Sequence, residues 1–151
     1  MILIQMTSRP LDILLVEDNE GDLQLTIAAL EDSKVQTHIH TVRDGETALA
    51  FLRRTGKHSD APRPDLIILD LGLPKVDGFE VLAEIKGDEV LSRTPVVVVS
   101  GTNHSLDIAR IYNLNAVAYL VKPAEFDKYF TTMRAIKELS FHRLSLPRTE
   151  A

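Results

Sequence analysis

Charged and hydroxyl side chains stand where short apolar runs of the chain end. Glu17 and Asp18 follow the first run, Asp70 ends the third, Ser100 ends the fourth, and Lys122 follows the fifth. Three crowded carboxylates repel one another, so such a cluster is tolerated when a cation neutralises it. Mg²⁺ prefers oxygen ligands and is typically held by one or two carboxylates plus a phosphate. These residue types predict Mg²⁺-dependent phosphoryl transfer, with Asp70 as nucleophile, Lys122 neutralising phosphoryl oxygens and Ser100 bonding one of them.

Each of these residues also has a purely structural interpretation. Asp and Ser commonly cap the helices that follow strands, and Lys side chains often lie along apolar surface with only the ammonium in water. Five polar groups at the ends of four strands favour a shared site over five unrelated caps. Zinc is disfavoured at these strand ends because the chain has no Cys and no His follows these runs.

The elements that must position these groups follow from the alternation of apolar runs with amphipathic segments. Strands are expected at residues 11–16, 35–42, 66–69, 96–99 and 116–121, where β-branched residues are frequent. Helices are expected near residues 22–31, 45–54, 78–86, 105–112 and 125–140. Strand followed by helix, five times, predicts an α/β fold with a five-stranded, doubly wound parallel sheet. Ligands of such sheets bind outside the carboxyl ends of the strands.

Composition limits the function classes further. A chain of 151 residues is the size of one compact domain, and the absence of Cys excludes thiolate catalysis and disulfide scaffolds. With 17 basic and 22 acidic residues the net charge is −5, so no positive field is available for nucleic acid. No apolar run approaches the ~20 residues that span a bilayer, and a cytoplasmic location is expected. The first five residues are expected to be disordered or part of an over-extended start.

Four sequence motifs occur in order at the ends of the expected strands. They are LLVEDN at residues 14–19, LDLGLPKVDG at 69–78, VSG at 99–101 and YLVKP at 119–123. Together they resemble the receiver domain of two-component response regulators, over residues 11–140. The resemblance implies a flavodoxin-like (β/α)5 fold, with residues 1–10 as an N-terminal extension and residues 141–151 as a C-terminal tail.

The resemblance also implies a role for each matched residue at the acidic site. Asp70 would take a phosphoryl group from the phosphohistidine of a histidine kinase. Asp18, Asp70 and the backbone carbonyl of Gly72 would bind Mg²⁺, for which Mn²⁺ or another divalent ion can substitute. Glu17 would act mainly through a metal-bound water, and it replaces the Asp that is more common at this position. The chain would then be a phosphoacceptor signalling protein rather than an enzyme.

Further matched residues belong to the switch that responds to phosphorylation. The resemblance implies that Lys122 pairs with the acyl phosphate and that the peptide bond to Pro123 is cis. Ser100 would be the hydroxyl that contacts the phosphoryl group, and Tyr119 the aromatic side chain whose rotamer changes with it. Gly72 offers no side chain to guide or block an attacking water.

Two other function classes remain as alternatives. In the first, the chain is a phosphorylation-independent adaptor with a vestigial acidic site, although Asp18, Asp70, Ser100 and Lys122 are all present. In the second, it is a metal-dependent phosphatase with an Asp nucleophile. That mechanism uses a second Asp two positions later as acid and base, and Gly72 cannot take that role. Mg²⁺ binding and turnover beyond one equivalent discriminate between these classes.

Residues 141–151 are too few to form an output domain, so we expect the output to be a partner protein that the sequence does not identify. Residues 126, 129, 130, 133 and 136 have the spacing of a helix that packs on the sheet. Further apolar residues favour a homodimer, for which Tyr129, Leu139, Phe141 and Leu144 are candidate contacts. This ending is similar to that of single-domain regulators partnered with bacterial and cyanobacterial phytochrome kinases. The similarity implies a light-regulated histidine kinase as donor.

Two histidines lie outside all of these motifs. His38 and His40 alternate on an expected strand and share one of its faces. No third ligand is nearby in the sequence, so a solvent-side pair is favoured over a metal site.

Overall fold

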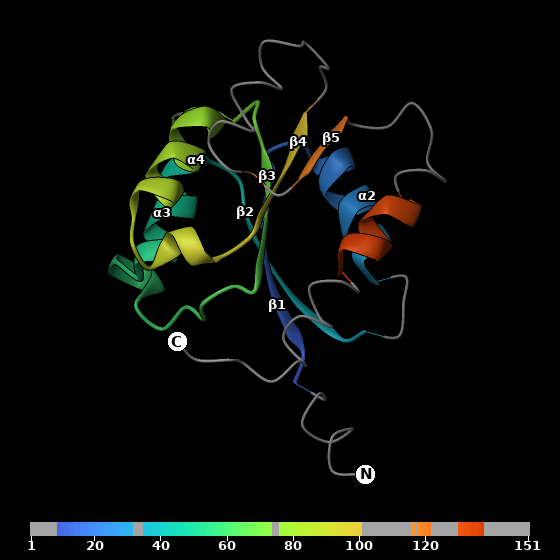
Figure 1. The fold of residues 1–151 in the computed structure, drawn as a ribbon, viewed down its shortest axis with the longest axis horizontal. Helices are drawn as coiled ribbons and strands as arrows, with labels where there is room; N and C mark the ends of the chain where they lie inside the picture. Colours follow the sequence, from blue (N-terminus) through green and yellow to red (C-terminus); the bar gives the residue numbers. More distant parts are fainter. Residues whose placement is uncertain are drawn as a thin grey trace.

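A single parallel sheet forms the centre of the molecule. The computed structural model describes residues 9–31, 35–73, 76–100, 116, 118–121 and 130–137. The strands of the sheet stand in the order β2-β1-β3-β4-β5, and each neighbouring pair is parallel (Figure 1). Their bounds are β1 (Leu11–Val16), β2 (Thr37–Val42), β3 (Leu66–Asp70), β4 (Val96–Ser100) and β5 (Ala118–Val121).

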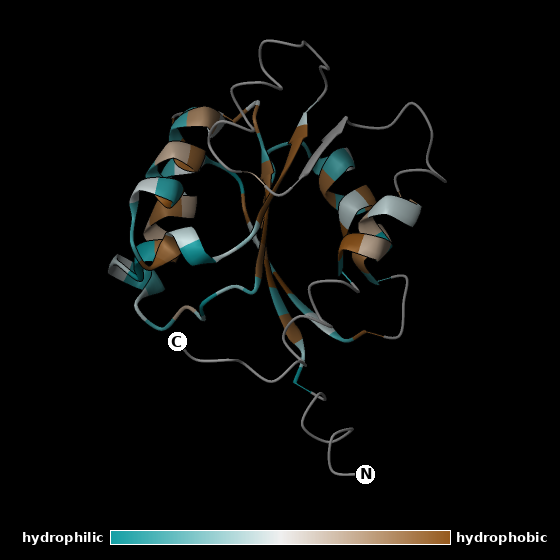
Figure 2. Cartoon of the chain, viewed as in Figure 1, coloured by the Kyte–Doolittle hydropathy of each residue, from teal (hydrophilic) through white to brown (hydrophobic). Residues whose placement is uncertain are grey.

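The central strands are apolar because both of their faces are covered. Every residue of β3 and β4 is buried, which is why these strands are continuous runs of Leu, Ile and Val rather than alternating ones. The edge strand β2 is partly exposed, and its sequence THIHTV contains more polar residues than those of the central strands. Figure 2 shows the apolar residues concentrated on the sheet and on the helix sides that face it.

Helices cover both faces of the sheet. The helices α3 (Gly45–Arg53) and α4 (Gly78–Gly87) lie on one face, while α2 (Glu20–Glu31) and a helical stretch at residues 130–137 lie on the other (Figure 1). Two short 3₁₀ turns, η1 (Gly56–His58) and η2 (Leu91–Arg93), complete the described elements. Successive β1 side chains alternate between the two apolar cores: Leu14 packs on the α3 and α4 side, and Ile13 and Leu15 pack on the other. None of the described helices is long and apolar enough to cross a membrane.

Polar side chains determine where the helices begin. Asn19 directly precedes α2, and its Oδ1 accepts a hydrogen bond from the backbone N–H of Asp22 in the first turn, at 2.9 Å. Asp44 and Asp77 precede α3 and α4 and accept backbone N–H bonds at 2.7 Å from residues 47 and 79. These bonds satisfy donors that the first turn of a helix leaves without an intrahelical acceptor.

The predicted α/β architecture with five parallel strands is confirmed. Strand β2 begins at Thr37 rather than at residue 35, and α2 begins two residues before its expected start because Asn19 caps it. In the stretch at residues 130–137, Met133 is buried and Phe130 packs against the same core, as the spacing predicted. The helix expected at residues 105–112 lies outside the described residues, as do the other parts of the expected last helix.

Candidate functional site

The strand order reverses direction between two neighbouring strands, β1 and β3. From β1 the chain moves outward to β2 on one side, and from β3 it continues to β4 and β5 on the other. This reversal is the topological switch point at which open α/β sheets bind ligands. Val16 pairs with Leu69 across β1 and β3, so the residues that follow Val16 and Leu69 lie together at this point.

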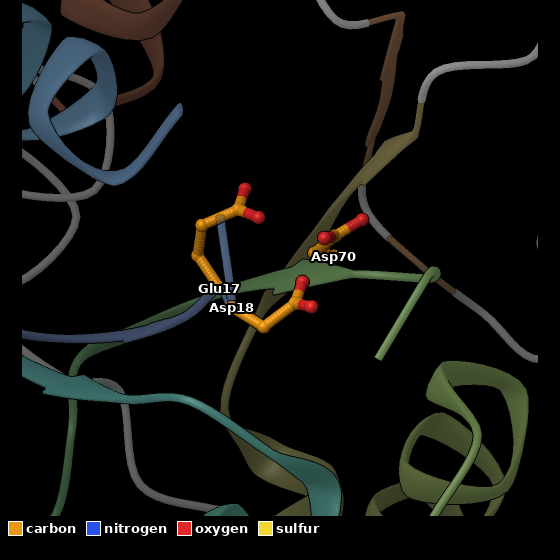
Figure 3. A group of neighbouring side chains, drawn as sticks. All are labelled: Glu17, Asp18 and Asp70. Atoms are coloured by element: carbon orange, nitrogen blue, oxygen red, sulfur yellow. The ribbon is translucent and has the colours of Figure 1, made fainter. Parts of the chain in front are cut away.

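Three carboxylates meet at the switch point. Glu17 and Asp18 follow β1, Asp70 ends β3, and one oxygen of each lies within 4.8 Å of one oxygen of each of the others (Figure 3). The side chains differ in solvent access, because Glu17 is 2% exposed and Asp70 is 4% exposed, whereas Asp18 is exposed. The sequence-based prediction that these three residues converge is therefore confirmed by the geometry.

Backbone N–H groups hold the two buried carboxylates in place. The Asn19 N–H donates to Glu17 Oε2 at 3.2 Å, and the Gly72 N–H donates to Asp70 Oδ1 at 3.1 Å. Beyond the end of β3, the Leu71 N–H continues the ladder to Val99 of β4 at 3.2 Å. Each carboxylate is thus oriented by the loop that immediately follows it.

Two helix-start glycines position the loop after Asp70. A Cβ added to Gly78 would lie 2.5 Å from Leu71 Cα and 2.8 Å from the Asp70 carbonyl oxygen, so the first turn of α4 touches this backbone directly. A Cβ on Gly45, at the start of α3, would collide with the Val76 carbonyl oxygen in the same loop. Sequence reasoning did not single out these glycines as functional. The sequence did contain a signal for them, because each glycine directly follows an Asp that caps a helix, in the pairs Asp44-Gly45 and Asp77-Gly78.

The switch residues are described in part. Ser100 ends β4 and is 5% exposed, one residue beyond Val99, which pairs with Asp70. Ser100 itself pairs with Val121 of β5, and Lys122 is the next residue in the chain. The backbone of Tyr119 pairs with Val98. The Tyr119 side chain, Lys122 and Pro123 lie outside the described residues, as do all four candidate dimer contacts.

An ion pair lies beside the start of α2. Arg43, which follows β2, contacts Glu20 at 2.6 Å, and Gln24 donates a second hydrogen bond to Glu20 at 2.9 Å. The hydrogen bonds from Gln24 and Arg43 lower the pKa of Glu20 below its ordinary value. The ion pair links the residue after β2 to the first residue of α2.

The donor set fits a hard divalent cation. All three side chains offer carboxylate oxygens, which Mg²⁺ and Mn²⁺ prefer as ligands. Softer metals prefer sulfur ligands, which the cluster does not contain. Crowding of three carboxylates at two neighbouring strand ends is a repulsive arrangement that a bound cation relieves. The arrangement is thus suited to binding a metal ion beside a carboxylate nucleophile.

Comparison with known proteins agrees with this geometry. Residues 13–134 match the family described as the response regulator receiver domain. The chain belongs to this family. It is 40% identical over 138 residues to the response regulator Rcp1 of Synechocystis sp., covering 91% of this chain and 94% of that protein. It is 42% identical over 130 residues to a probable methanogenesis regulatory protein, FilR2, of Methanothrix harundinacea, covering 85% and 83%.

Solved structures of receiver proteins share the fold. The phosphorylated cyanobacterial phytochrome response regulator RcpA aligns with a TM-score of 0.84 and 45% identity, covering 93% of this chain and all of that one. The Mn²⁺-bound form of Rcp1 aligns with a TM-score of 0.83 and 40% identity, covering 92% and 100%. The bacteriophytochrome response regulator AtBRR has a TM-score of 0.72 and 37% identity, covering 95% and 98%. The flavodoxin-like receiver fold and the likeness to phytochrome regulators, both predicted from sequence, are confirmed.

Proposed function

We propose that this response regulator accepts a phosphoryl group on Asp70 and thereby changes its binding to a partner protein. The observation that carries the proposal is the buried Asp70 carboxylate, which lies within 4.8 Å of the Glu17 and Asp18 carboxylates at the switch point of the sheet. We take residues 11–140 as the receiver unit, flanked by an extension and a tail. The chain would be a stoichiometric acceptor rather than an enzyme with turnover.

The proposed cofactor is Mg²⁺, with Mn²⁺ as a substitute. Asp18, Asp70 and the Gly72 backbone carbonyl would bind the ion directly, and Glu17 would contact it through water. When bound, the ion supplies positive charge to the oxygens of the incoming phosphoryl group. The all-oxygen donor set supports this assignment, as does the Mn²⁺-bound form of the related Rcp1.

The proposed reaction moves one phosphoryl group between two side chains. An Asp70 carboxylate oxygen forms a bond to phosphorus while the bond from phosphorus to the donor's histidine nitrogen breaks, and that imidazole nitrogen then takes up a proton. The Gly72 N–H bond to Oδ1 orients the carboxylate for this attack. Lys122 would neutralise phosphoryl oxygens, Ser100 would donate to one of them, and Tyr119 would follow the movement of Ser100.

The proposed donor is a phytochrome histidine kinase. The support is similarity to RcpA and AtBRR, whose names identify them as phytochrome or bacteriophytochrome response regulators. Incubation with purified phosphorylated kinases of different classes tests the donor, because the cognate kinase should lose its label to this chain fastest.

We also propose that the chain forms a homodimer, through Tyr129, Leu139, Phe141 and Leu144.

Acceptance of the phosphoryl group can be measured without a kinase. The protein is incubated with acetyl phosphate and Mg²⁺ and weighed intact by mass spectrometry. Wild type should gain one phosphoryl group, and Asp70→Asn should gain none. Asp44→Asn is the matched control, because Asn retains the helix cap of α3 while making the same chemical change. A wild type without adduct, or an Asp70→Asn variant with the same adduct, would refute the proposal.

A further inference from the structure

Two histidines of β2 and an aspartate of β1 lie close together on the sheet, away from the carboxyl ends of the strands where the acidic cluster lies. Asp12 lies near the start of β1 and pairs with His38 of β2, and His40 follows two residues later on the same face. His40 Nε2 lies 3.1 Å from Asp12 Oδ1, and His38 Nδ1 lies 3.6 Å from the same oxygen. The third group that the linear sequence did not reveal is therefore supplied by the neighbouring strand.

The His40 contact with Asp12 is within hydrogen-bond distance, and both distances lie close to the separation of neighbouring ligands of one tetrahedral metal ion. Zinc binds imidazole nitrogen and carboxylate oxygen at about 2.0–2.2 Å, which puts tetrahedral neighbours about 3.3–3.6 Å apart. The observed distances of 3.1 and 3.6 Å fall close to this range. Two nitrogens and one oxygen make up a three-residue donor set of the kind that leaves a fourth position for water.

A second layer of contacts fixes Asp12. Its backbone N–H donates to Asp65 Oδ2 at 2.9 Å, and Arg9 contacts both oxygens of Asp65, at 3.0 and 3.2 Å. Arg9 also reaches Asp12, but through Oδ2 at 3.8 Å, on the oxygen that does not contact the histidines. Two carboxylates and one guanidinium leave a net negative charge beside the imidazoles, which favours a cation.

Binding requires one side chain to move. Among the described residues only the acidic cluster has all of its ligand atoms within 4.8 Å of one another, so the two imidazoles must approach each other. The His38 side chain is 64% exposed on the edge strand and can rotate. The His40 side chain is 29% exposed and its ring lies 5.6 Å from that of Phe51, which holds it towards the α3 side. The expected solvent-side pair is thus exposed at His38 only.

We propose that Asp12, His38 and His40 bind one transition-metal ion of the Zn²⁺ class. Imidazole ligands suit Zn²⁺, Co²⁺ and Ni²⁺, whereas Mg²⁺ prefers the all-oxygen cluster at the other end of the strands. The two sites therefore select different metals. Occupation of the histidine site links β2, at the edge of the sheet, to β1 through side chains and raises the thermal stability of the protein.

Calorimetric titration of the full chain with Zn²⁺, in the presence of saturating Mg²⁺, tests the site. Wild type should bind one equivalent. Loss of either histidine, as His38→Gln or His40→Gln, should weaken binding by about tenfold or more. His58→Gln is the matched control, because His58 also lies close to Phe51, with ring centroids 5.7 Å apart, but is not a proposed ligand. Asp18→Asn tests whether the acidic cluster is the true binding site.

A spectroscopic readout separates ligation from folding. Co²⁺ in a tetrahedral nitrogen and oxygen site should give visible absorption bands that His38→Gln, an exposed substitution, removes without changing the metal-free melting temperature. The proposal is overturned by a wild type that binds no Zn²⁺ with Mg²⁺ present. Binding that survives unchanged in both histidine variants, or that disappears in Asp18→Asn, overturns it equally.

Discussion

Substitution of Asp18 by Asn should stabilise the metal-free protein and abolish its stabilisation by Mg²⁺. Asp18 lies within 4.8 Å of two other carboxylates, so Coulomb's law gives about 0.9 kcal/mol per pair in bulk water and about 3.5 kcal/mol at an effective dielectric constant of 20. Because Asp18 is exposed, the value for water is the appropriate one. Glu17 is its neighbour in the chain, so that repulsion persists in the unfolded state. The repulsion specific to the folded state is the one with Asp70.

The expected gain is therefore about 1 kcal/mol without metal, or roughly 2–4 °C in melting temperature for a domain of this size. Mg²⁺ reverses the order of stability. At a concentration one hundred times its dissociation constant, a ligand that binds only the folded state stabilises it by about 2.7 kcal/mol. Wild type should gain this amount and Asp18→Asn should not. With Mg²⁺, wild type should therefore melt above the variant.

Thermal unfolding in chelator and in a Mg²⁺ series measures both effects. Asp60→Asn is the matched control, because it removes an exposed carboxylate outside the cluster. Its melting temperature should rise with Mg²⁺ as that of wild type does. The electrostatic reasoning is refuted if Asp18→Asn is less stable than wild type in chelator, or if Mg²⁺ stabilises both proteins equally.

Further predictions concern the loop after the acceptor and the tail. Gly78→Ala should cost about 1–3 kcal/mol in unfolding free energy and slow phosphorylation, because its Cβ meets backbone, whereas Gly87→Ala, with nothing within 4 Å, should cost neither. Chemical denaturation and acetyl phosphate kinetics check this, and equal losses in both variants would contradict it. Gly72→Leu should lengthen the lifetime of the acyl phosphate several-fold by crowding the attacking water, since a Cβ there lies 3.8 Å from the acceptor Oδ1; release of phosphate at an unchanged rate would argue otherwise. Polar replacement of Phe141 and Leu144 should shift a dimer to monomer in sedimentation, and a wild type that is monomeric at all concentrations would exclude the dimer.

The sheet and the acidic cluster could be predicted because both depend on local patterns. Buried parallel strands are continuous apolar runs, and the polar residue that ends each run reaches the same edge of the sheet. Strand order adds what the sequence alone does not contain. The neighbours β1 and β3 are 50 residues apart in the chain, and their adjacency brings Glu17 and Asp18 to Asp70.

Other contacts between elements could not be predicted, because they depend on strand register and helix packing rather than on residue type and spacing. Asp12 contacts His38 and His40 only because of the register of β1 against β2, so the linear sequence shows no third ligand near the two histidines. The glycines at the starts of α3 and α4 look like ordinary helix-start residues until their distance to the loop after Asp70 is known. Residue type and spacing thus identify an edge of the sheet, but the packing that orients each group depends on the whole fold.

Identification of the phosphorylated side chain is the most direct test of the central claim. The protein is phosphorylated in Mg²⁺ and reduced with borohydride, which converts an aspartyl phosphate to homoserine with release of phosphate. Peptide mass spectrometry then locates the homoserine. We predict it at position 70 alone, in wild type and not in Asp70→Asn. Homoserine at another aspartate, or none in a protein that carries a phosphoryl group, would contradict the assignment of Asp70 as the acceptor.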